Sequence, residues 1–211
     1  MPKKPKISAV LLAAGASRRL GRNKLLLEVG GRPVVRRAAA ALLGAEVSEV
    51  IVVTGHEAEA VRRALGGLDV RLVHNPAFAD GQAASLAAGL ARADAGAGGI
   101  LFAQGDQPFL TEALANALVR AFAGAEPPPL AAAPFFGDRR GTPVLFSAEL
   151  RAELARAQGD EGGRSVLARV REEEPERFLA VPWEEERAFL DLDTEEAYKK
   201  LLAETEGRAP D

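Results

Sequence analysis

Cysteine is absent from this 211-residue chain, and histidine occurs only twice, as His56 and His74. The lack of cysteine excludes disulfides, thiol nucleophiles and metal sites built on cysteine ligands. Two histidines exclude a three-histidine metal site within one chain. A loop histidine held by hydrogen bonds is the commoner role, so we assign neither histidine to catalysis. A chain without cysteine suits a reducing compartment, and we expect a cytoplasmic protein.

Long apolar runs are also missing. No stretch approaches 18 apolar residues, so the sequence predicts no membrane-spanning helix. The basic N-terminus and the apolar run from Ile7 to Ala14 look briefly like a signal peptide. That run is short and is followed by further cations, which argues against a signal peptide. We therefore expect residues 1–6 to form a flexible tail that leads into a buried strand.

Excess positive charge is lacking as well. The chain has 27 basic and 30 acidic residues, a formal net charge of −3, and 47% hydrophobic residues. This composition supports a full hydrophobic core and argues against bulk nucleic-acid binding. An anionic ligand would therefore need a local cluster of cations.

Strand and helix patterns alternate through the first 125 residues. The predicted strands lie at 7–12, 50–54, 70–73, 99–102, 130–136, 143–146, 178–181 and 189–190. The predicted helices lie at 33–43, 58–65, 82–91, 111–123, 148–157, 165–173 and 195–203. This alternation predicts a three-layer α/β/α fold with a mostly parallel, doubly wound sheet. We expect one domain over residues 7–203, divided near residue 125 by a proline run, and a flexible C-terminal tail at 204–211.

Ligands of such sheets bind at the carboxyl ends of the strands, so we examined the loops after Leu12, Thr54, Val73, Phe102 and Phe146. The first of these loops begins with small residues and then carries four cations without an intervening acid: Arg18, Arg19, Arg22 and Lys24. This is the local cationic cluster that phosphate binding requires. The spacing is neither that of a P-loop nor that of a dinucleotide-binding fingerprint. A solvated loop is the alternative interpretation.

Carboxylates occur at two other places where a strand is predicted to end. Asp106 directly follows a predicted buried strand, and Mg²⁺ is typically held by one or two carboxylates together with substrate phosphates. A simple Asp-turn is the alternative. Asp193 with Glu196 is typical of a helix N-cap, although one carboxylate of this segment could instead face Asp106 and complete a metal site.

These residues together resemble a known family. Leu12-Ala13-Ala14-Gly15, followed by Arg19 and Lys24, is similar to the signature of small nucleotidyltransferases with a GlmU-like, Rossmann-type fold, which is the fold of nucleotide-diphospho-sugar transferases. Further segments match in the family's order at 53–56, 74–76, 81–90, 105–108, 141–144, 159–164 and 191–194. Within this family, the chain most resembles the molybdenum-cofactor cytidylyltransferases.

The resemblance implies a role for each matched residue. Leu12, Ala13, Ala14 and Gly15 would hold base and ribose, while Gly81 and Ser85, with Asn75 nearby, would read the base. Arg19 and Lys24 would bind the β- and γ-phosphates and act in catalysis together with Asp106. Asp106 would hold Mg²⁺ with Asp193, or with Asp191 in its place. Arg164 would bind a phosphate of the acceptor. Residues 7–125 would thus form the nucleotide-binding half and residues 126–203 the acceptor half.

The activity implied by the resemblance is transfer of CMP from CTP to the phosphate of the molybdopterin cofactor, with release of pyrophosphate. A molybdoenzyme or its chaperone would receive the product, and neither nucleic acid nor membrane is an expected partner. The alternatives are a guanylyl- or sugar-phosphate nucleotidyltransferase and a non-catalytic cofactor-binding chaperone. A nicotinamide- or flavin-dependent oxidoreductase is disfavoured because GxGxxG is missing. Two residues depart from the family pattern: Gln107 stands where methionine is common, and Thr142 where histidine is common.

Overall fold

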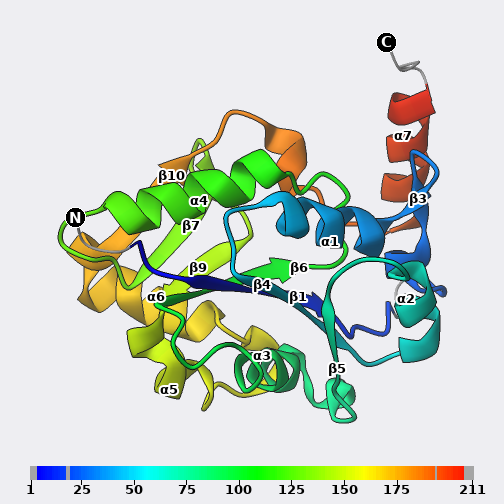
Figure 1. Ribbon diagram of the computed structural model, residues 1–211. Helices are drawn as coiled ribbons and strands as arrows, with labels where there is room; N and C mark the ends of the chain where they lie inside the picture. The colour runs from blue at the N-terminus through cyan, green and yellow to red at the C-terminus, as the bar shows by residue number, and fades with distance from the viewer. Residues whose placement is uncertain (1–3, 18–19, 193, 207–211) are drawn as a thin grey trace.

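The computed structural model describes the backbone of residues 4–17, 20–192 and 194–206. A mixed eight-stranded sheet forms the middle layer in the order β10-β7-β9-β6-β1-β4-β5, with β8 paired to β7 (Figure 1). Its strands are β1 (Ile7–Ala13), β4 (Glu49–Thr54), β5 (Arg71–His74), β6 (Gly99–Gln104), β7 (Ala131–Phe136), β8 (Arg139–Arg140), β9 (Val144–Ser147) and β10 (Phe178–Pro182). A separate small hairpin joins β2 (Glu28–Val29) to β3 (Arg32–Pro33).

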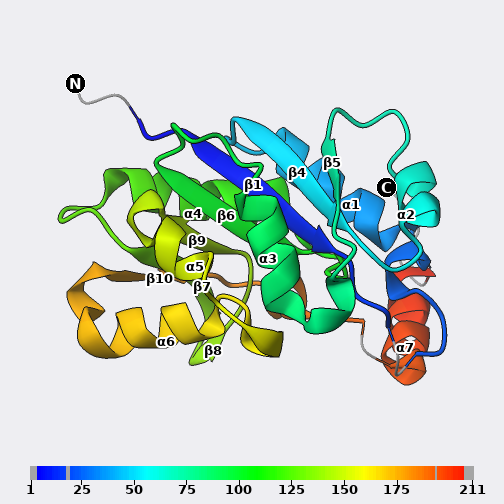
Figure 2. The same cartoon turned by 90° about the horizontal axis from the view of Figure 1, so that it is seen from below.

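Helices cover both faces of the sheet. They are α1 (Val34–Gly44), α2 (Ala58–Ala64), α3 (Gln82–Leu90), α4 (Glu112–Gly124), α5 (Arg151–Leu154), α6 (Arg164–Glu173) and α7 (Glu195–Glu206). Most buried residues of α1, α2 and α4 belong to the core on one face, and the buried apolar side chains Leu86, Leu90, Leu154, Val166, Leu167 and Val170 of α3, α5 and α6 belong to the core on the other. Figure 2 shows the second group of helices lying across the sheet. The expected three-layer α/β/α class is confirmed.

The central strand β1 is covered by helices on both faces, which explains the continuous apolar run in its sequence. Ala9 and Leu11 are buried in the core beneath α1 and α4. Val10 and Leu12 are buried in the core beneath α3 and α6. A strand covered on both faces has no solvent-facing side, so the alternation of polar and apolar residues disappears.

The direction of β9 differs from a simple parallel arrangement. β9 pairs antiparallel with both β6 and β7, whereas β1 pairs parallel with β4 and β6. The carboxyl end of β9 therefore lies at the opposite edge of the sheet, and the loop before β9 reaches the edge where β1 and β6 end. The expectation that the loop after Phe146 faces the ligand is wrong for this reason. Because β9 follows the proline run and pairs with β6, both parts of the chain share one sheet.

Three predicted elements near the C-terminus also differ. Residues 189–190 are not a strand, because a 3₁₀ helix covers Glu186–Phe189 and buries Phe189 against the core. The predicted helix at 148–157 is shorter, with a 3₁₀ turn at Ala148–Leu150 followed by α5. The last helix, α7, continues to Glu206, so a tail starting at 204 begins too early. Its final residues are ordinary helix formers, and no Gly or Pro stops the helix before Gly207.

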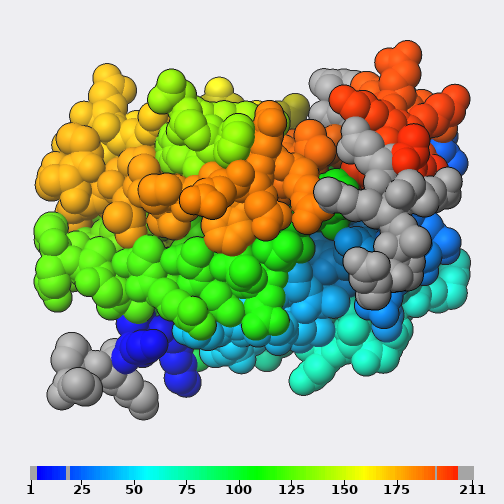
Figure 3. Space-filling view, turned by 90° about the horizontal axis from the view of Figure 1, so that it is seen from above, coloured from blue at the N-terminus to red at the C-terminus, as the bar shows by residue number. Residues whose placement is uncertain are grey.

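The C-terminal segment packs beside the start of the chain. Leu192 and Leu201 are buried together with Leu27, Val29 and Val34. Figure 3 shows α7 lying next to segments from the beginning of the sequence. No helix in the described part of the chain is long and apolar enough to cross a membrane.

Candidate active site

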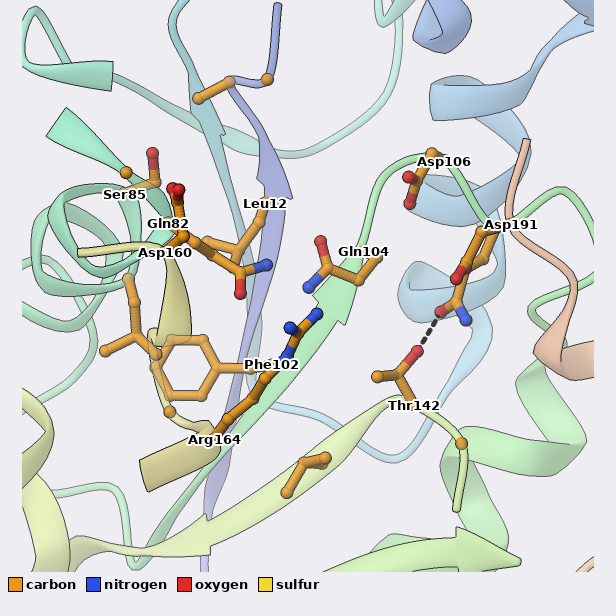
Figure 4. A pocket seen from close by; sticks show the side chains of 18 of the residues that line it. Leu12, Gln82, Ser85, Phe102, Gln104, Asp106, Thr142, Asp160, Arg164 and Asp191 are labelled. Atoms are coloured by element: carbon orange, nitrogen blue, oxygen red, sulfur yellow. Dashed lines mark hydrogen bonds between the residues drawn. The ribbon is translucent and has the colours of Figure 1, made fainter. Parts of the chain in front are cut away.

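A cavity of about 650 Å³ opens where β1 and β6 end. Its floor is apolar, formed by Leu12, Phe102 and Phe146 from three neighbouring strands, while its walls are polar (Figure 4). Most of the predicted site residues line it: Leu12, Ala14, Gly15, Lys24, Gly81, Ser85, Asp106 and Arg164. The structure therefore brings together residues from both predicted halves of the domain.

Some predicted residues are placed differently. Ala13 is buried within β1, with 1% of its surface exposed, and it does not line the cavity. Asn75 lies behind the wall, because its Nδ2 donates a hydrogen bond to Ser85 Oγ at 3.0 Å and its Oδ1 accepts one from the Ala77 amide. Asn75 thus orients Ser85 and is not itself a lining residue. Arg19 and Asp193 lie outside the described residues.

Hydrogen bonds fix the loop that presents Lys24. Ser17 has a positive φ of 49°, and its Oγ accepts a hydrogen bond from the Lys24 amide at 3.1 Å. Asn23 caps the short 3₁₀ helix that begins at Lys24, because its Oδ1 accepts from the Leu25 amide at 3.1 Å. Positive φ at a residue other than glycine costs energy and is typical of functional loops. The strained turn therefore holds Lys24 at the cavity.

Lys24 and Asp106 form an ion pair at the wall of the cavity. Lys24 Nζ contacts Asp106 Oδ2, and the two side chains are only 18% and 15% exposed. Asp106 Oδ1 is buried and has no hydrogen-bond partner within the described protein. A buried carboxylate oxygen without a partner is costly, so the site is suited to a further cation or hydrogen-bond donor.

A close approach between two strand ends positions Asp106. The Gly105 amide donates to the Leu12 carbonyl at 2.9 Å. A Cβ at Gly105 would lie 3.0 Å from that same oxygen, tighter than ordinary contact. Glycine thus allows the loop after β6 to pack directly on the end of β1, which places Asp106 next to the first loop.

Gly81 supports the opposite wall of the cavity. Its φ is +104°, and a Cβ there would lie 2.6 Å from the Gly159 backbone. The crossing of these two segments requires glycine, because any side chain would collide with the 159–160 loop. The matched motifs around Gly81 and Gly159 therefore meet in space and together shape this wall.

Oxygen ligands for a divalent cation are available at Asp106 and Asp191. Both residues line the cavity, and Figure 4 shows them on the same side of it. Buried Leu192 anchors the segment that carries Asp191. Among the described residues, no group of three His, Asp or Glu side chains is close enough to hold a metal ion. The partnerless Oδ1 of Asp106 fits a cation whose remaining ligands come from a substrate.

The N-cap of α7 and the role of Arg22 also differ from expectation. Thr194 caps α7, since its Oγ1 accepts a hydrogen bond from the Ala197 amide at 3.1 Å, and the predicted cap Asp193 lies outside the described residues. Arg22 contacts both carboxylate oxygens of Glu195, at 2.8 and 2.9 Å, and lies over the Tyr198 ring. This cation of the first loop therefore attaches the C-terminal helix. His56 and His74 do not line the cavity.

Several polar lining residues escaped the sequence analysis: Gln82, Gln104, Arg139, Arg140 and Asp160. The sequence feature that could have indicated this part of the site is the pair of adjacent arginines, Arg139 and Arg140, directly before Gly141. The two departures from the family pattern prove to be partners, because Thr142 Oγ1 donates a hydrogen bond to Gln107 Oε1 at 2.6 Å. The sequence shows them only as two separate departures and gives no sign that they contact each other.

Comparisons with known proteins agree with this geometry. Residues 9–175 match the MobA-like NTP transferase domain. The nicotine blue oxidoreductase of Paenarthrobacter nicotinovorans is 32% identical over 94% of this chain and 97% of its own. A nucleotidyl transferase structure from Methanothermobacter thermautotroptrophicus has a TM-score of 0.82 at 28% identity, covering 96% of this chain and 98% of its own.

A solved structure with metal is similar as well. The Rv0371c protein of Mycobacterium tuberculosis, in complex with manganese, has a TM-score of 0.75 at 29% identity, covering 94% of this chain and 98% of its own. Nucleotidyltransferase structures with 18% and 15% identity share the fold alone. The family match, which spans most of the chain, shows that this protein belongs to the MobA-like NTP transferase domain family.

Proposed function

We propose that this protein transfers CMP from CTP to the phosphate of the molybdopterin cofactor and releases pyrophosphate. The observation that carries the proposal is the cavity that joins the Lys24 loop and Asp106 to an arginine-lined wall from the second half of the chain. A cation next to a carboxylate, at the carboxyl end of a parallel sheet, suits a nucleoside triphosphate. The choice of cytidine rests on the sequence resemblance.

The chemistry needs no general base. A phosphate monoester is already an anion at neutral pH, so one of its oxygens can attack the α-phosphorus of CTP directly. A phosphoanhydride bond forms as the bond to the β-phosphate breaks, and the electron pair leaves with pyrophosphate. No proton has to be removed, which agrees with the absence of both histidines from the cavity wall. The demand on the protein is electrostatic stabilisation.

Lys24 would supply the positive charge for the leaving group. Its ammonium group is paired with Asp106. Binding of a triphosphate would offer Lys24 a second anionic partner and would leave Asp106 available to a cation. Arg19 would assist on the phosphates, as the resemblance implies.

Asp106 would hold the divalent metal, with Asp191 or Asp193 as second carboxylate. When bound, Mg²⁺ would neutralise phosphate charge and orient the triphosphate. Support comes from the partnerless Asp106 Oδ1 and from the related Rv0371c protein, whose structure contains manganese.

Ser85 would contact the base from the first turn of α3. Its hydroxyl is fixed by Asn75 and lies in the cavity wall next to Leu86. A fixed hydroxyl discriminates between bases by hydrogen bonding. A guanylyl- or sugar-phosphate transferase would use the same wall with another ligand.

Pyrophosphate release with CTP, GTP, ATP and UTP, each with Mg²⁺ and with or without molybdopterin cofactor, tests the proposal. We expect release with CTP only when the cofactor is present. Release with GTP or with a sugar phosphate would replace the substrate assignment. Nucleotide or cofactor binding without pyrophosphate would indicate a carrier protein. Because one relative is named an oxidoreductase, oxidation of reduced nicotinamide cofactors should be measured in parallel, and we expect none.

A further inference from the structure

Arg140 is a cation that lacks a counter-charge within the described protein. It lies on β8, which pairs with β7 so that Arg140 stands opposite Phe135. It lines the cavity, and within the described residues its guanidinium group makes a single hydrogen bond, a long contact of 3.4 Å from Nη1 to the Gly141 carbonyl. No carboxylate of the described residues lies within ion-pair distance of it. A half-buried guanidinium in this situation is electrostatically unsatisfied.

Burial and neighbouring cations make the uncompensated charge of Arg140 less favourable still. Burial, followed by the positive charges of Arg164 and Arg171, lowers the pKa of Arg140. Arg164 lines the same cavity, and Figure 4 shows its side chain extending into the cavity toward Gln104. Arg171 is different, because it lies over the rings of Phe135 and Phe178 and does not line the cavity.

The neighbouring Arg139 contacts the 186–189 turn. Its Nη2 donates to the Phe189 carbonyl at 3.1 Å, and its Nη1 lies 3.6 Å from Glu186 Oε1. Arg139 therefore attaches the 186–189 turn to the hairpin. Arg139 also lines the cavity, but these two contacts engage its guanidinium group, whereas Arg140 has no ion-pair partner among the described residues.

Carboxylates in the same cavity do not neutralise Arg140. Asp106 is paired with Lys24. Asp160 lies by Gly81 in the loop that leads into α6, and among the described residues it forms no ion pair with Arg140 or Arg164. Asp191 also lines the cavity but is not within ion-pair distance of Arg140 or Arg164 in the described residues. The β8 and α6 side of the cavity thus carries uncompensated positive charge.

We propose that Arg140, together with Arg164, binds the phosphate monoester group of the acceptor on the β8 and α6 side of the cavity. The proposal rests on the proposed function, because that reaction requires an acceptor phosphate as nucleophile. Two guanidinium groups match the geometry of a phosphate dianion through paired N–H···O contacts. Binding of this dianion would also relieve the repulsion between Arg140 and Arg164.

Calorimetric titration of the full-length protein with phenyl phosphate tests this assignment. We expect Arg140→Gln to raise the dissociation constant by about tenfold or more, because charge-assisted contacts are lost. Arg140→Lys should raise it less, since the charge remains while the planar fork is lost. Arg171→Gln is the matched control, which removes a neighbouring cation outside the cavity, and should change the constant by less than about twofold.

Further titrations test where phenyl phosphate binds and which charge on the ligand is needed. Lys24→Gln tests whether phenyl phosphate binds at the Lys24 loop instead, because loss of binding in this variant without loss in Arg140→Gln would place the phosphate there. Benzoate should bind more weakly, as a carboxylate carries only one charge. Equal losses in Arg140→Gln and Arg171→Gln, or loss in Lys24→Gln alone, would overturn the assignment, as would benzoate binding as tightly as phenyl phosphate.

Turnover separates this assignment from the proposed function. If CTP and cofactor yield pyrophosphate, Arg140→Gln should raise the acceptor KM while the CTP KM stays unchanged. An unchanged acceptor KM would refute the role of Arg140 and leave the proposed reaction intact. If no nucleotide yields pyrophosphate but phenyl phosphate binding still requires Arg140, the proposed reaction fails and the anion site stands. If Arg140→Gln shows no cooperative thermal unfolding transition, the variant is not folded. Phenyl phosphate binding and the acceptor KM are then measured with Arg140→Lys instead.

Discussion

Lys24 and Asp106, from the loops after two neighbouring strands, neutralise each other at the wall of the cavity. The sequence assigns them to different partners, Lys24 to phosphates and Asp106 to a metal ion. Their pairing is compatible with both assignments, because each group holds the other at the wall of the cavity. A metal-bound triphosphate would replace one ion pair by two: Lys24 with phosphate and Asp106 with metal.

Replacing Lys24 by Ala should lower the kcat/KM for pyrophosphate release by roughly 10²–10³-fold, the range typical for loss of one electrostatic contact to a transition state. The substitution also leaves the buried Asp106 without its partner. Steady-state assays with Lys200→Ala as control check this, since Lys200 is exposed on α7. Wild-type turnover in Lys24→Ala would contradict the assigned role.

Replacing Asp106 by Asn should weaken metal activation. The isosteric amide keeps the shape of the side chain but removes the charge that a cation requires. We expect the metal concentration for half-maximal activity to rise by at least about tenfold, because even outer-shell partners of metal ligands contribute that much. Titrations with Mg²⁺ and Mn²⁺ measure it. Asp160→Asn, which removes another carboxylate from the cavity lining, should leave the midpoint unchanged, and equal shifts in both variants would argue against a metal at Asp106.

The hydrogen bond from Thr142 to Gln107 should show coupling in a double-mutant cycle. Thr142→Val alone leaves the Gln107 oxygen, on a side chain only 2% exposed, without its donor, which costs about 1–3 kcal/mol of unfolding free energy. Adding Gln107→Met removes the second polar partner and should recover part of this loss. Urea denaturation of the four proteins measures the coupling. Strictly additive losses would mean that the contact is energetically neutral.

Replacing Leu192 by Ala should release the C-terminal segment from the first loop. Leu192 is 1% exposed in a small core with residues of the β2–β3 region, so truncation should cost about 2–5 kcal/mol of unfolding free energy. Leu190→Ala is the control, because Leu190 is 37% exposed and should lose less than about 0.5 kcal/mol. Urea denaturation and limited proteolysis of α7 measure the two effects. Equal stability of the two variants would refute the anchoring role of Leu192.

Local sequence signals predicted most elements of the fold. Continuous apolar runs marked the buried strands, and the predicted helix at 111–123 corresponds to α4, which Thr111 caps because its Oγ1 accepts a hydrogen bond from the Leu114 amide at 3.2 Å. The antiparallel direction of β9 was not predicted, because a short apolar strand reads the same in either direction. Residues 189–190 were predicted to be a strand, but Phe189 ends the 3₁₀ turn at Glu186–Phe189, which has a single buried aromatic residue and no helical repeat to indicate it.

The sequence by itself determined the fold class, the cationic loop and the carboxylate after β6, because these depend on residue type, order and short-range spacing. Tertiary structure decided which side chains meet. It paired Lys24 with Asp106, joined Thr142 to Gln107, moved Asn75 behind Ser85 and turned Arg140 into the cavity. Such contacts depend on strand order and direction, which are set by packing of the whole sheet and not by any local segment.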